Sequence, residues 1–298
     1  MLDSFRVLTV FSIPRAFVGA TGIVQRNAIK SWRLLAPDVE VVLYGDDPGV
    51  AAAAGELGAR HEPRVVRNEF GTPLVDGVFA HAEATGRHPV LCYVNADVVL
   101  LPEFIAAVRS IHSRRFLMVG DRWDMDIEAP LDFSSAGWAD RLRTSAHHHG
   151  ARQPPWGSDY FVFPKGAIGP VPPFAVGRPR WDNWMIYNAR RRGVPVFDAS
   201  PVVTAIHPNH DYTHWPRTGD GAVPEEHLNE LVYGSRHFYT LVAATHVITR
   251  RGPRPALTYP HLNHRLKHFV RYFLPESLTG HGPLFRGAPR EPGARPRR

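Results

Sequence analysis

The sequence predicts an α/β fold with a mainly parallel central sheet flanked by helices. Apolar, strand-like runs alternate with helical stretches through the first hundred residues, and polar side chains directly follow several of these runs. The chain has 298 residues, of which 44% are hydrophobic and 21% charged, which is enough for one large α/β domain. Repeated strand–helix alternation favours right-handed crossovers and a doubly wound parallel sheet.

The first half of the chain carries the clearest alternation. Strands are expected over residues 6–13, 39–44 and 89–97, and residues 65–66 are compatible with a short strand. Helices are expected over residues 23–35, 50–57 and 72–85. The first of these helices follows a glycine-bearing loop at 18–22.

The second half is less regular. Strands are expected over residues 116–120, 159–163, 195–198 and 202–206. A helix is expected over 184–192, because its basic C-terminal end suits the helix dipole. Two stretches are expected to be loops: the aromatic and acidic residues 121–126 and the three histidines 147–149. Three consecutive histidines cannot easily share one metal from a single helix face, and no cysteine accompanies them.

The expected organisation is one domain over 1–250, a basic amphipathic extension over 251–285 and a disordered basic tail over 286–298. No stretch of about 18 apolar residues and no basic-then-apolar leader is present, and the single cysteine, Cys92, is expected in the core. These features favour the cytoplasm. The net charge is +7, but no nucleic-acid-binding module is recognisable, so nucleic acid is not an expected partner.

Residues 261–273 interleave basic and aromatic side chains. This pattern suits either a helix docked on the domain or peripheral contact with an anionic membrane surface.

The most informative motif is Asn95-Ala96-Asp97, which ends the strand expected over 89–97. Open α/β sheets bind ligands at the carboxyl ends of their strands. Oxygen-bearing side chains suit Mg²⁺ or Mn²⁺, which often bridges a carboxylate to substrate phosphates. The tripeptide therefore indicates a site for a metal-bound diphosphate, with a helix cap or a turn as the alternative.

Two further groups precede or follow expected strands. Asp46 follows the strand over 39–44 and suits a ribose hydroxyl or a base amide, or else a simple turn. Ser158 and Asp159 stand at the start of the strand over 159–163 and suit sugar hydroxyls, with Trp156 stacking on a pyranose face. A turn before a core strand is the structural alternative.

Two more groups lie later in the chain. Asp182, near a helix start, suits a general base on an acceptor hydroxyl, or else a helix N-cap. His207 follows the last expected strand and would complete a metal shell, whereas His210 and Asp211 suit contacts with phosphate or substrate. A satisfied core or surface histidine is the alternative there.

Several competing motifs are missing from the sequence. It has no Gly-x-x-x-x-Gly-Lys-Ser/Thr loop, no Gly-x-Ser-x-Gly elbow, no His-Glu-x-x-His and no Gly-x-Gly-x-x-Gly after the first strand. This argues against a P-loop enzyme, an α/β hydrolase, a zincin and a dinucleotide oxidoreductase.

In their order along residues 5–215, these motifs resemble the glycosyltransferases of the GT-A type. The chain is also similar to a group of uncharacterised bacterial proteins that share the patterns Asn-Ala-Asp, Gly-x-Asp-Tyr-Phe, Trp-Asp-Asn-Trp and His-x-Asn-His-Asp. The resemblance implies a GT-A fold and a nucleotide-diphosphate sugar donor. It also implies Mn²⁺ or Mg²⁺, and a glycan, glycolipid or small-molecule acceptor.

The resemblance also implies roles for particular residues. Asp182 would be the catalytic base of an inverting reaction, and Asp97 with His207 would hold the metal. The donor would contact Phe11, Ser12, Arg15, Asp46, Asn95, Ala96 and Asp97. The acceptor or the transferred sugar would contact Trp156, Ser158, Asp159, Trp181, Asn183, Trp184, His210 and Asp211. Asn95 departs from a full Asp-x-Asp motif and removes one charge from the metal site.

Two other functions stay open. A sugar nucleotidyltransferase would need a glycine-rich, basic loop after the first strand, but residues 12–19 contain only Arg15 as a basic residue. A non-catalytic nucleotide-sugar or carbohydrate-binding protein is also compatible with Asn95. The donor sugar, the base, the acceptor, the stereochemistry and the oligomeric state are not determined by these residues.

Overall fold

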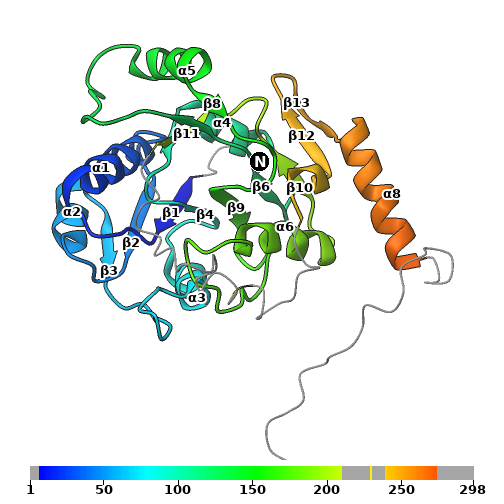
Figure 1. The fold of residues 1–298 in the computed structure, drawn as a ribbon, viewed down its shortest axis with the longest axis horizontal. Helices are drawn as coiled ribbons and strands as arrows, with labels where there is room; N and C mark the ends of the chain where they lie inside the picture. Colours follow the sequence, from blue (N-terminus) through cyan, green and yellow to red (C-terminus); the bar gives the residue numbers. More distant parts are fainter. Residues whose placement is uncertain (1–6, 210–228, 230–238, 274–298) are drawn as a thin grey trace, which may run out of the picture. The chain divides into compact units, whose positions relative to one another are not determined.

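The computed structural model describes residues 7–209, residue 229 and residues 239–273 (Figure 1). The chain divides into two compact units, Met1–Ala256 and Leu257–Arg298. The first unit is a mixed α/β fold with a large central sheet flanked by helices. This confirms the predicted fold class.

Nine strands form the main sheet. Their order across it is β13 (Gly252–Pro255), β12 (His246–Thr249), β10 (Val196–Asp198), β6 (Leu117–Val119), β9 (Tyr160–Pro164), β4 (Val90–Val94), β1 (Leu8–Ser12), β2 (Glu40–Tyr44) and β3 (Arg60–Glu62). Most neighbours run parallel, but β9 is antiparallel to both β4 and β6, and β13 is antiparallel to β12.

A second, four-stranded sheet is small. Its order is β5 (Val99–Leu100), β11 (Ala205–Pro208), β7 (Trp123–Met125) and β8 (Ala151–Arg152). The strand β11 pairs with β5 antiparallel and with β7 parallel. Because β5 begins just after the Asn95-Ala96-Asp97 motif, this sheet draws residues from three distant parts of the chain to the same place.

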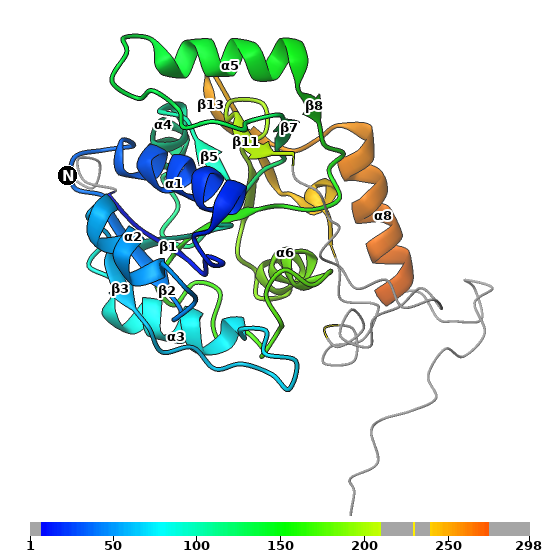
Figure 2. The ribbon, with the colours of Figure 1, turned by 60° about the vertical axis from the view of Figure 1, so that its left-hand side comes forward.

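The described helices of the first unit are α1 (Gly19–Arg33), α2 (Val50–Leu57), α3 (Val75–Thr85), α4 (Glu103–Ser110), α5 (Trp138–His149) and α6 (Trp181–Arg191), with a 3₁₀ turn at Leu241–Ala243. Figure 2 shows α1 and α3 on opposite sides of β1 and β2. The C-terminal end of α2 is closed by Gly58, whose φ of 64° is a left-handed conformation that glycine adopts easily.

Two apolar cores lie on the two faces of the main sheet. Successive side chains of a strand point to opposite faces, and in β2 the pair Val41 and Leu43 joins one core while Val42 and Tyr44 join the other. Residues of α1, α2 and α4 complete the first core, and residues of α3 and α6 complete the second. The sheet is thus buried on both faces, which explains the continuous apolar runs of its inner strands.

Several element predictions were wrong in detail. The strand expected at 65–66 is absent, since Val66 is exposed in a loop and the edge strand β3 is the polar segment Arg60–Glu62. The histidines at 147–149 end helix α5 rather than forming a loop, because the ring of His147 packs against Trp123 with 4.6 Å between ring centroids.

Other elements begin or end at different residues than predicted, and some were not predicted. Helix α1 begins at Gly19, inside the expected loop, and α6 begins at Trp181, three residues earlier than predicted. The expected loop at 121–126 contains β7, and α4 was not predicted. The strand expected at 202–206 lies slightly later, as β11, and belongs to the small sheet.

The second unit contains the helix α8 (Tyr259–Phe273). Its first turns expose Tyr259, Leu262 and Leu266 to solvent. None of the helices in the described parts of the chain combines the length and the hydropathy that crossing a bilayer requires.

Candidate active site at the carboxyl edge of the sheet

The candidate site forms at one edge of the main sheet. The strands β1, β4, β6 and β10 run in the same direction and therefore end at the same edge. Because β9 runs the opposite way, the residues that precede it arrive at this edge too. The sheet thus brings Asn95 and Asp97, after β4, next to Ser158 and Asp159, before β9.

Asn95 and Asp159 are joined directly. The Asn95 side-chain Nδ2 donates to Asp159 Oδ1 at 2.7 Å, and the Asn95 backbone N–H donates to the Asp159 carbonyl at 2.9 Å. The other carboxylate oxygen of Asp159 accepts a hydrogen bond from Arg122 Nη1 at 2.8 Å. Both oxygens of Asp159 are therefore engaged within the protein, and its charge is balanced by Arg122.

His207 lies between Asp97 and Asp124 in an arrangement that the small sheet produces. The pairing of β7 with β11 sets Asp124 opposite His207, and β5 places Asp97 beside the same strand. His207 Nε2 is 3.5 Å from Asp97 Oδ2, and His207 Nδ1 is 3.6 Å from Asp124 Oδ1. Each ring nitrogen of His207 thus faces a carboxylate.

The pKa of His207 reflects this environment. The ring is buried, which by itself lowers the pKa of an imidazole. Its hydrogen bond to Asp97 and the negative charges of Asp97 and Asp159 act in the opposite direction and prevail, so the pKa is raised above its ordinary value.

The side chains around Asp97 suit a metal ion whose remaining coordination positions are filled by substrate. No three histidine, cysteine or acidic side chains among the described residues are placed to hold a metal by themselves. Mg²⁺ is commonly held by one or two carboxylates while substrate phosphates and waters fill the remaining positions. Asp97 and His207 fit such a partial shell, and Asp124 on the far nitrogen of His207 fits the carboxylate that typically orients a metal-binding histidine.

Asp182 is the second residue of α6, and its half-buried carboxylate faces the loop before β9. Ser158 N–H donates to Asp182 Oδ2 at 3.4 Å, and a Cβ atom at Gly157 would stand 2.9 Å from that oxygen. The absence of a side chain at position 157 therefore allows the loop to approach the carboxylate. Burial, followed by the charge of Asp159, raises the pKa of Asp182 to about 6, although backbone N–H groups oppose the shift.

The helix cap before Asp182 is strained. Arg180 is the N-cap residue of α6, with a φ of 84°, and it is the only non-glycine residue with positive φ in the described part of the chain. A left-handed conformation costs a non-glycine residue about 1–3 kcal/mol. This unfavourable conformation occurs at the turn that begins α6 and places Asp182 next to the loop before β9.

The tryptophans predicted to bind sugar lie in different environments. Trp181 and Trp184 are buried in the second core, where Trp181 packs against Tyr93 with ring centroids 5.0 Å apart. Core packing accounts for both side chains. Trp156, in contrast, is 71% exposed beside Gly157, so it is the one of these three tryptophans whose side chain is accessible from solvent.

Asn183 and Ser158 hold the backbone of the site. Asn183 Nδ2 donates to the Trp156 carbonyl at 2.6 Å and to the Tyr239 carbonyl at 3.1 Å. The buried hydroxyl of Ser158 donates to the Gly120 carbonyl at 2.8 Å. These two predicted ligand contacts thus fix the loop that carries Trp156 and Asp159.

Among the residues predicted to bind the donor, several are buried within the fold. Phe11 and Ala96 are buried, and the Ser12 hydroxyl donates to the Val94 carbonyl at 2.6 Å, which joins the ends of β1 and β4. Arg15 is exposed, and its backbone is held by the side chain of Gln25.

The predicted donor residue Asp46 lies farther along the same edge, after β2. Its carboxylate is 69% exposed and accepts a hydrogen bond from Arg67 Nη2 at 2.8 Å, which lowers its pKa. Two other predicted residues, His210 and Asp211, fall outside the described residues.

Arg122, Asp124 and Asp121 belong to the site but were not singled out from the sequence. The signal was present in the acidic stretch 121–126, which was expected to be a loop. Arg122 joins the two carboxylates of Asp124 and Asp159, with Nε to Asp124 Oδ1 at 2.8 Å. Burial raises the pKa of Asp121 to about 6 even though Arg152 Nε donates to it at 2.7 Å.

Comparisons with known proteins find similarity at the level of structure. No family model matches the chain, and no curated protein matches its sequence. Glucosyl-3-phosphoglycerate synthase from Mycobacterium tuberculosis, solved with Mg²⁺ and uridine diphosphate, is 14% identical, with a TM-score of 0.45 over 71% of this chain and 75% of the other. A putative nucleotide-diphospho-sugar transferase from Desulfovibrio desulfuricans G20 is 9% identical, with a TM-score of 0.43 over 68% and 82%. GalNAc-T7, solved with UDP, GalNAc and Mn²⁺, is 15% identical, with a TM-score of 0.43 over 76% and 48%.

Proposed function

We propose that the protein is a metal-dependent glycosyltransferase that moves a sugar from a nucleotide-diphosphate donor to an acceptor hydroxyl. One observation carries the proposal. A continuous series of contacts connects the candidate metal ligands with the candidate base: His207 with Asp97 and Asp124, Arg122 with Asp124 and Asp159, Asn95 with Asp159, and Ser158 with Asp182. The order of the same motifs along the chain supports it through the resemblance to GT-A glycosyltransferases.

In this proposal, the two ends of the site have different tasks. Asp97 and His207 would hold Mn²⁺ or Mg²⁺, which when bound neutralises charge on the departing diphosphate. Asn95, held by Asp159, would position the donor beside them. At the other end, Asp182 would contact the acceptor hydroxyl, and the exposed ring of Trp156 would support the acceptor or the transferred sugar.

The proposed chemistry is a displacement at the anomeric carbon. The acceptor oxygen forms a bond to that carbon while the bond from the carbon to the diphosphate oxygen breaks and its electron pair leaves with the diphosphate. The hydroxyl proton passes to the Asp182 carboxylate, which acts as general base. Its raised pKa of about 6 places it near the range where a base is ionised yet able to accept a proton. Attack from the face opposite the diphosphate gives inversion.

The proposal also includes a peripheral contact between the second unit and a membrane. The first turns of α8 expose Tyr259, Leu262 and Leu266, and Arg265 lies among them. Apolar and basic side chains on one helix suit the surface of a bilayer rich in anionic lipid. Such a contact would favour a glycolipid over a soluble acceptor.

A ligand-binding screen tests the proposed function. The purified protein is melted with UDP, GDP, CDP or dTDP, and with their common sugar derivatives, each in Mn²⁺, Mg²⁺ or EDTA. A ligand that binds only the folded state raises the melting temperature by mass action, so one nucleotide family should give a shift that requires the metal. Radiolabelled transfer or hydrolysis of the matching sugar nucleotide then tests turnover.

The screen separates the alternatives. A metal-dependent shift without any sugar release over long incubation would favour a non-catalytic binding protein. No shift with any nucleotide, in a protein that melts cooperatively, would contradict the proposal.

A further inference from the structure

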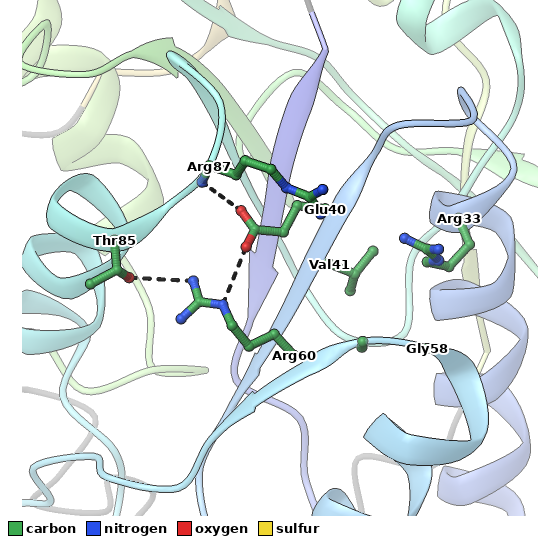
Figure 3. Close-up of a pocket in the computed structure, with 8 residues that line it drawn as sticks. Arg33, Glu40, Val41, Gly58, Arg60, Thr85 and Arg87 are labelled. Atoms are coloured by element: carbon green, nitrogen blue, oxygen red, sulfur yellow. Dashed lines mark hydrogen bonds and ion pairs between the residues drawn. The ribbon is translucent and has the colours of Figure 1, made fainter.

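A pocket lies at the opposite edge of the main sheet from the candidate active site. It has a volume of about 510 Å³ and surrounds Glu40, the first residue of β2 (Figure 3). Three arginines line it: Arg33 from the last turn of α1, Arg60 from the start of β3, and Arg87 from the segment before β4. Since β2 ends at the active-site edge and begins here, this pocket is separate from the site described above.

Among the described residues that line the pocket, Glu40 is the one with an acidic side chain, and both of its carboxylate oxygens accept hydrogen bonds. Glu40 Oε2 accepts hydrogen bonds from Thr9 Oγ1 and from the Arg87 backbone N–H, both at 2.7 Å, and Glu40 Oε1 accepts one from Arg60 Nε at 3.2 Å. Burial opposes ionisation of Glu40, but these hydrogen bonds and the charge of Arg60 prevail and lower its pKa. The charges of Glu40 and Arg60 therefore offset each other. Both carboxylate oxygens of Glu40 already accept hydrogen bonds from the protein.

The remaining charge in the pocket is positive. Arg33 Nη1 donates to the Val39 carbonyl at 2.5 Å, a neutral partner. Within the described part of the chain, the Arg87 guanidinium has neither a hydrogen bond nor an ion pair, and only its backbone N–H is engaged. Figure 3 shows Arg87 beside Glu40 on one side of β2 and Arg33 on the other side of this strand, and both residues line the pocket.

Helix dipoles explain these arginines only in part. Arg33 lies in the last turn of α1, where a cation offsets the negative end of the helix. Arg87 lies beyond the end of α3, where Lys165 Nζ already donates to the Gly86 carbonyl at 2.6 Å. A second cation is not needed there, and Arg87 faces the pocket rather than the helix end.

We propose that this pocket binds a phosphoryl group, either of a small phosphorylated metabolite or of inorganic phosphate. A guanidinium presents paired N–H donors that match two oxygens of a phosphate, and two such groups suit a dianion. The volume lies within the range of small-molecule sites, about 300–1,000 Å³. The ligand would thus occupy a second site, at the edge of the sheet where β2 begins.

Calorimetric titration of the full chain in EDTA tests the proposal. The probes are inorganic phosphate, glucose 6-phosphate and, at matched ionic strength, chloride. EDTA removes metal-dependent binding at the candidate active site, and an Asp97→Asn variant, tested in parallel, shows that the signal does not arise there. Arg87→Ala and Arg33→Ala remove the two arginines, and Arg64→Ala, which changes an arginine with an 87% exposed side chain outside the pocket, is the charge-matched control.

The expected result is saturable phosphate binding that weakens at least tenfold in Arg87→Ala and in Arg33→Ala and is unchanged in Arg64→Ala and Asp97→Asn. Tighter binding of glucose 6-phosphate than of phosphate would assign the pocket to a phosphorylated metabolite, and the reverse order to free phosphate. Equal binding by the parent protein and Arg87→Ala, or heats no larger than those of chloride, would overturn the proposal. Both results are independent of whether the protein transfers sugar, because Asp97→Asn disables only the other site.

Discussion

At position 95 the side chain must donate a hydrogen bond. Asn95 Nδ2 lies 2.7 Å from Asp159 Oδ1, and a carboxylate can only accept there. An aspartate at 95 would place two carboxylates against each other in a half-buried site. The asparagine that departs from a full Asp-x-Asp motif is therefore explained by its partner, and Asp97 with His207 is the pair proposed to bind the metal.

We predict that Asn95→Asp lowers the free energy of unfolding by about 1–3 kcal/mol at pH 7 in EDTA. The charge of Asp159 would raise the pKa of the new carboxyl group in the folded state. The loss is therefore present above that pKa and disappears as the pH falls and the group is protonated. Chemical denaturation at pH 7 and at pH 5 measures it.

Asn209→Asp is the matched control for this substitution. Asn209 Nδ2 also donates to a carboxylate, Asp126 Oδ1, at 2.8 Å, but this pair is exposed. Solvent screens exposed charges, so the control should lose much less stability. Equal losses in the two variants would show that the Asn95–Asp159 contact is not specially demanding.

Asp182 gives a prediction about activity. Asp182→Asn should reduce turnover by about 10²–10⁴-fold while leaving nucleotide binding intact, because an amide cannot accept the acceptor proton. In the parent protein kcat/KM should fall as the pH drops below about 6, since the pKa of Asp182 is raised to about 6 and only the ionised form is a base. Steady-state kinetics across pH 5–8 measures both effects.

Asp140→Asn serves as the control for Asp182→Asn, since its carboxylate is 79% exposed on α5, away from the sheet edge. It should retain full turnover and the same pH profile as the parent. Substantial turnover in Asp182→Asn would exclude the base and would fit a retaining reaction in which this carboxylate only positions a sugar hydroxyl.

At the scale of elements, the start of α6 contains both the strained residue Arg180 and the proposed base Asp182. Arg180→Gly should raise the free energy of unfolding by about 1 kcal/mol, because glycine adopts the left-handed conformation of this position without a steric penalty. We expect turnover to fall in the same variant, because the freed cap no longer holds Asp182 firmly against the loop before β9. Urea denaturation and kinetics on one preparation test the pair of effects.

Arg191→Gly makes the opposite change in the same helix. Arg191 has helical geometry at the end of α6, where glycine costs about 1 kcal/mol relative to ordinary residues. Stability should therefore fall in this variant and rise in Arg180→Gly. If Arg180→Gly is also destabilised, the left-handed cap is not a source of strain.

Strand pairing also decided which elements meet. The motifs before β9 and after β4 are more than 60 residues apart, and their contact depends on β9 being inserted antiparallel between β4 and β6. The alternation in the first half predicted its inner strands β1, β2 and β4, since both faces of these strands are apolar, but it did not predict the polar edge strand β3. The short strands β5, β7 and β8 have no such signal, because two or three residues are too few for a periodicity.

At the scale of the whole molecule, we expect the first unit to fold without the second and the second unit to be needed for membrane binding. A chain that ends at Ala256 should keep the melting temperature of the full chain, because the first unit contains both cores. It should lose binding to vesicles of phosphatidylglycerol and phosphatidylcholine, since Leu262 and Leu266 lie beyond the cut. Differential scanning fluorimetry and vesicle sedimentation measure the two properties.

A full-length variant with Leu262→Ser and Leu266→Ser tests whether the two apolar side chains, rather than the whole C-terminal segment, are needed for vesicle binding. Both side chains are exposed on α8, so the substitutions should leave folding unchanged and weaken sedimentation with vesicles. Vesicle binding that survives the truncation or the double substitution would contradict the proposed membrane contact.

From the sequence alone, the fold class followed from the alternation of apolar runs and helical stretches, and the location of the candidate site followed from Asn95-Ala96-Asp97 at a strand end. These are local patterns, which a chain carries in its order of residues. The tertiary structure alone decided that Asp159 binds Asn95, that Asp124 lies behind His207, and that Trp181 and Trp184 belong to the core while Trp156 is exposed. Such facts depend on which strands pair and in which direction, and that is set by the packing of the whole sheet rather than by any one segment.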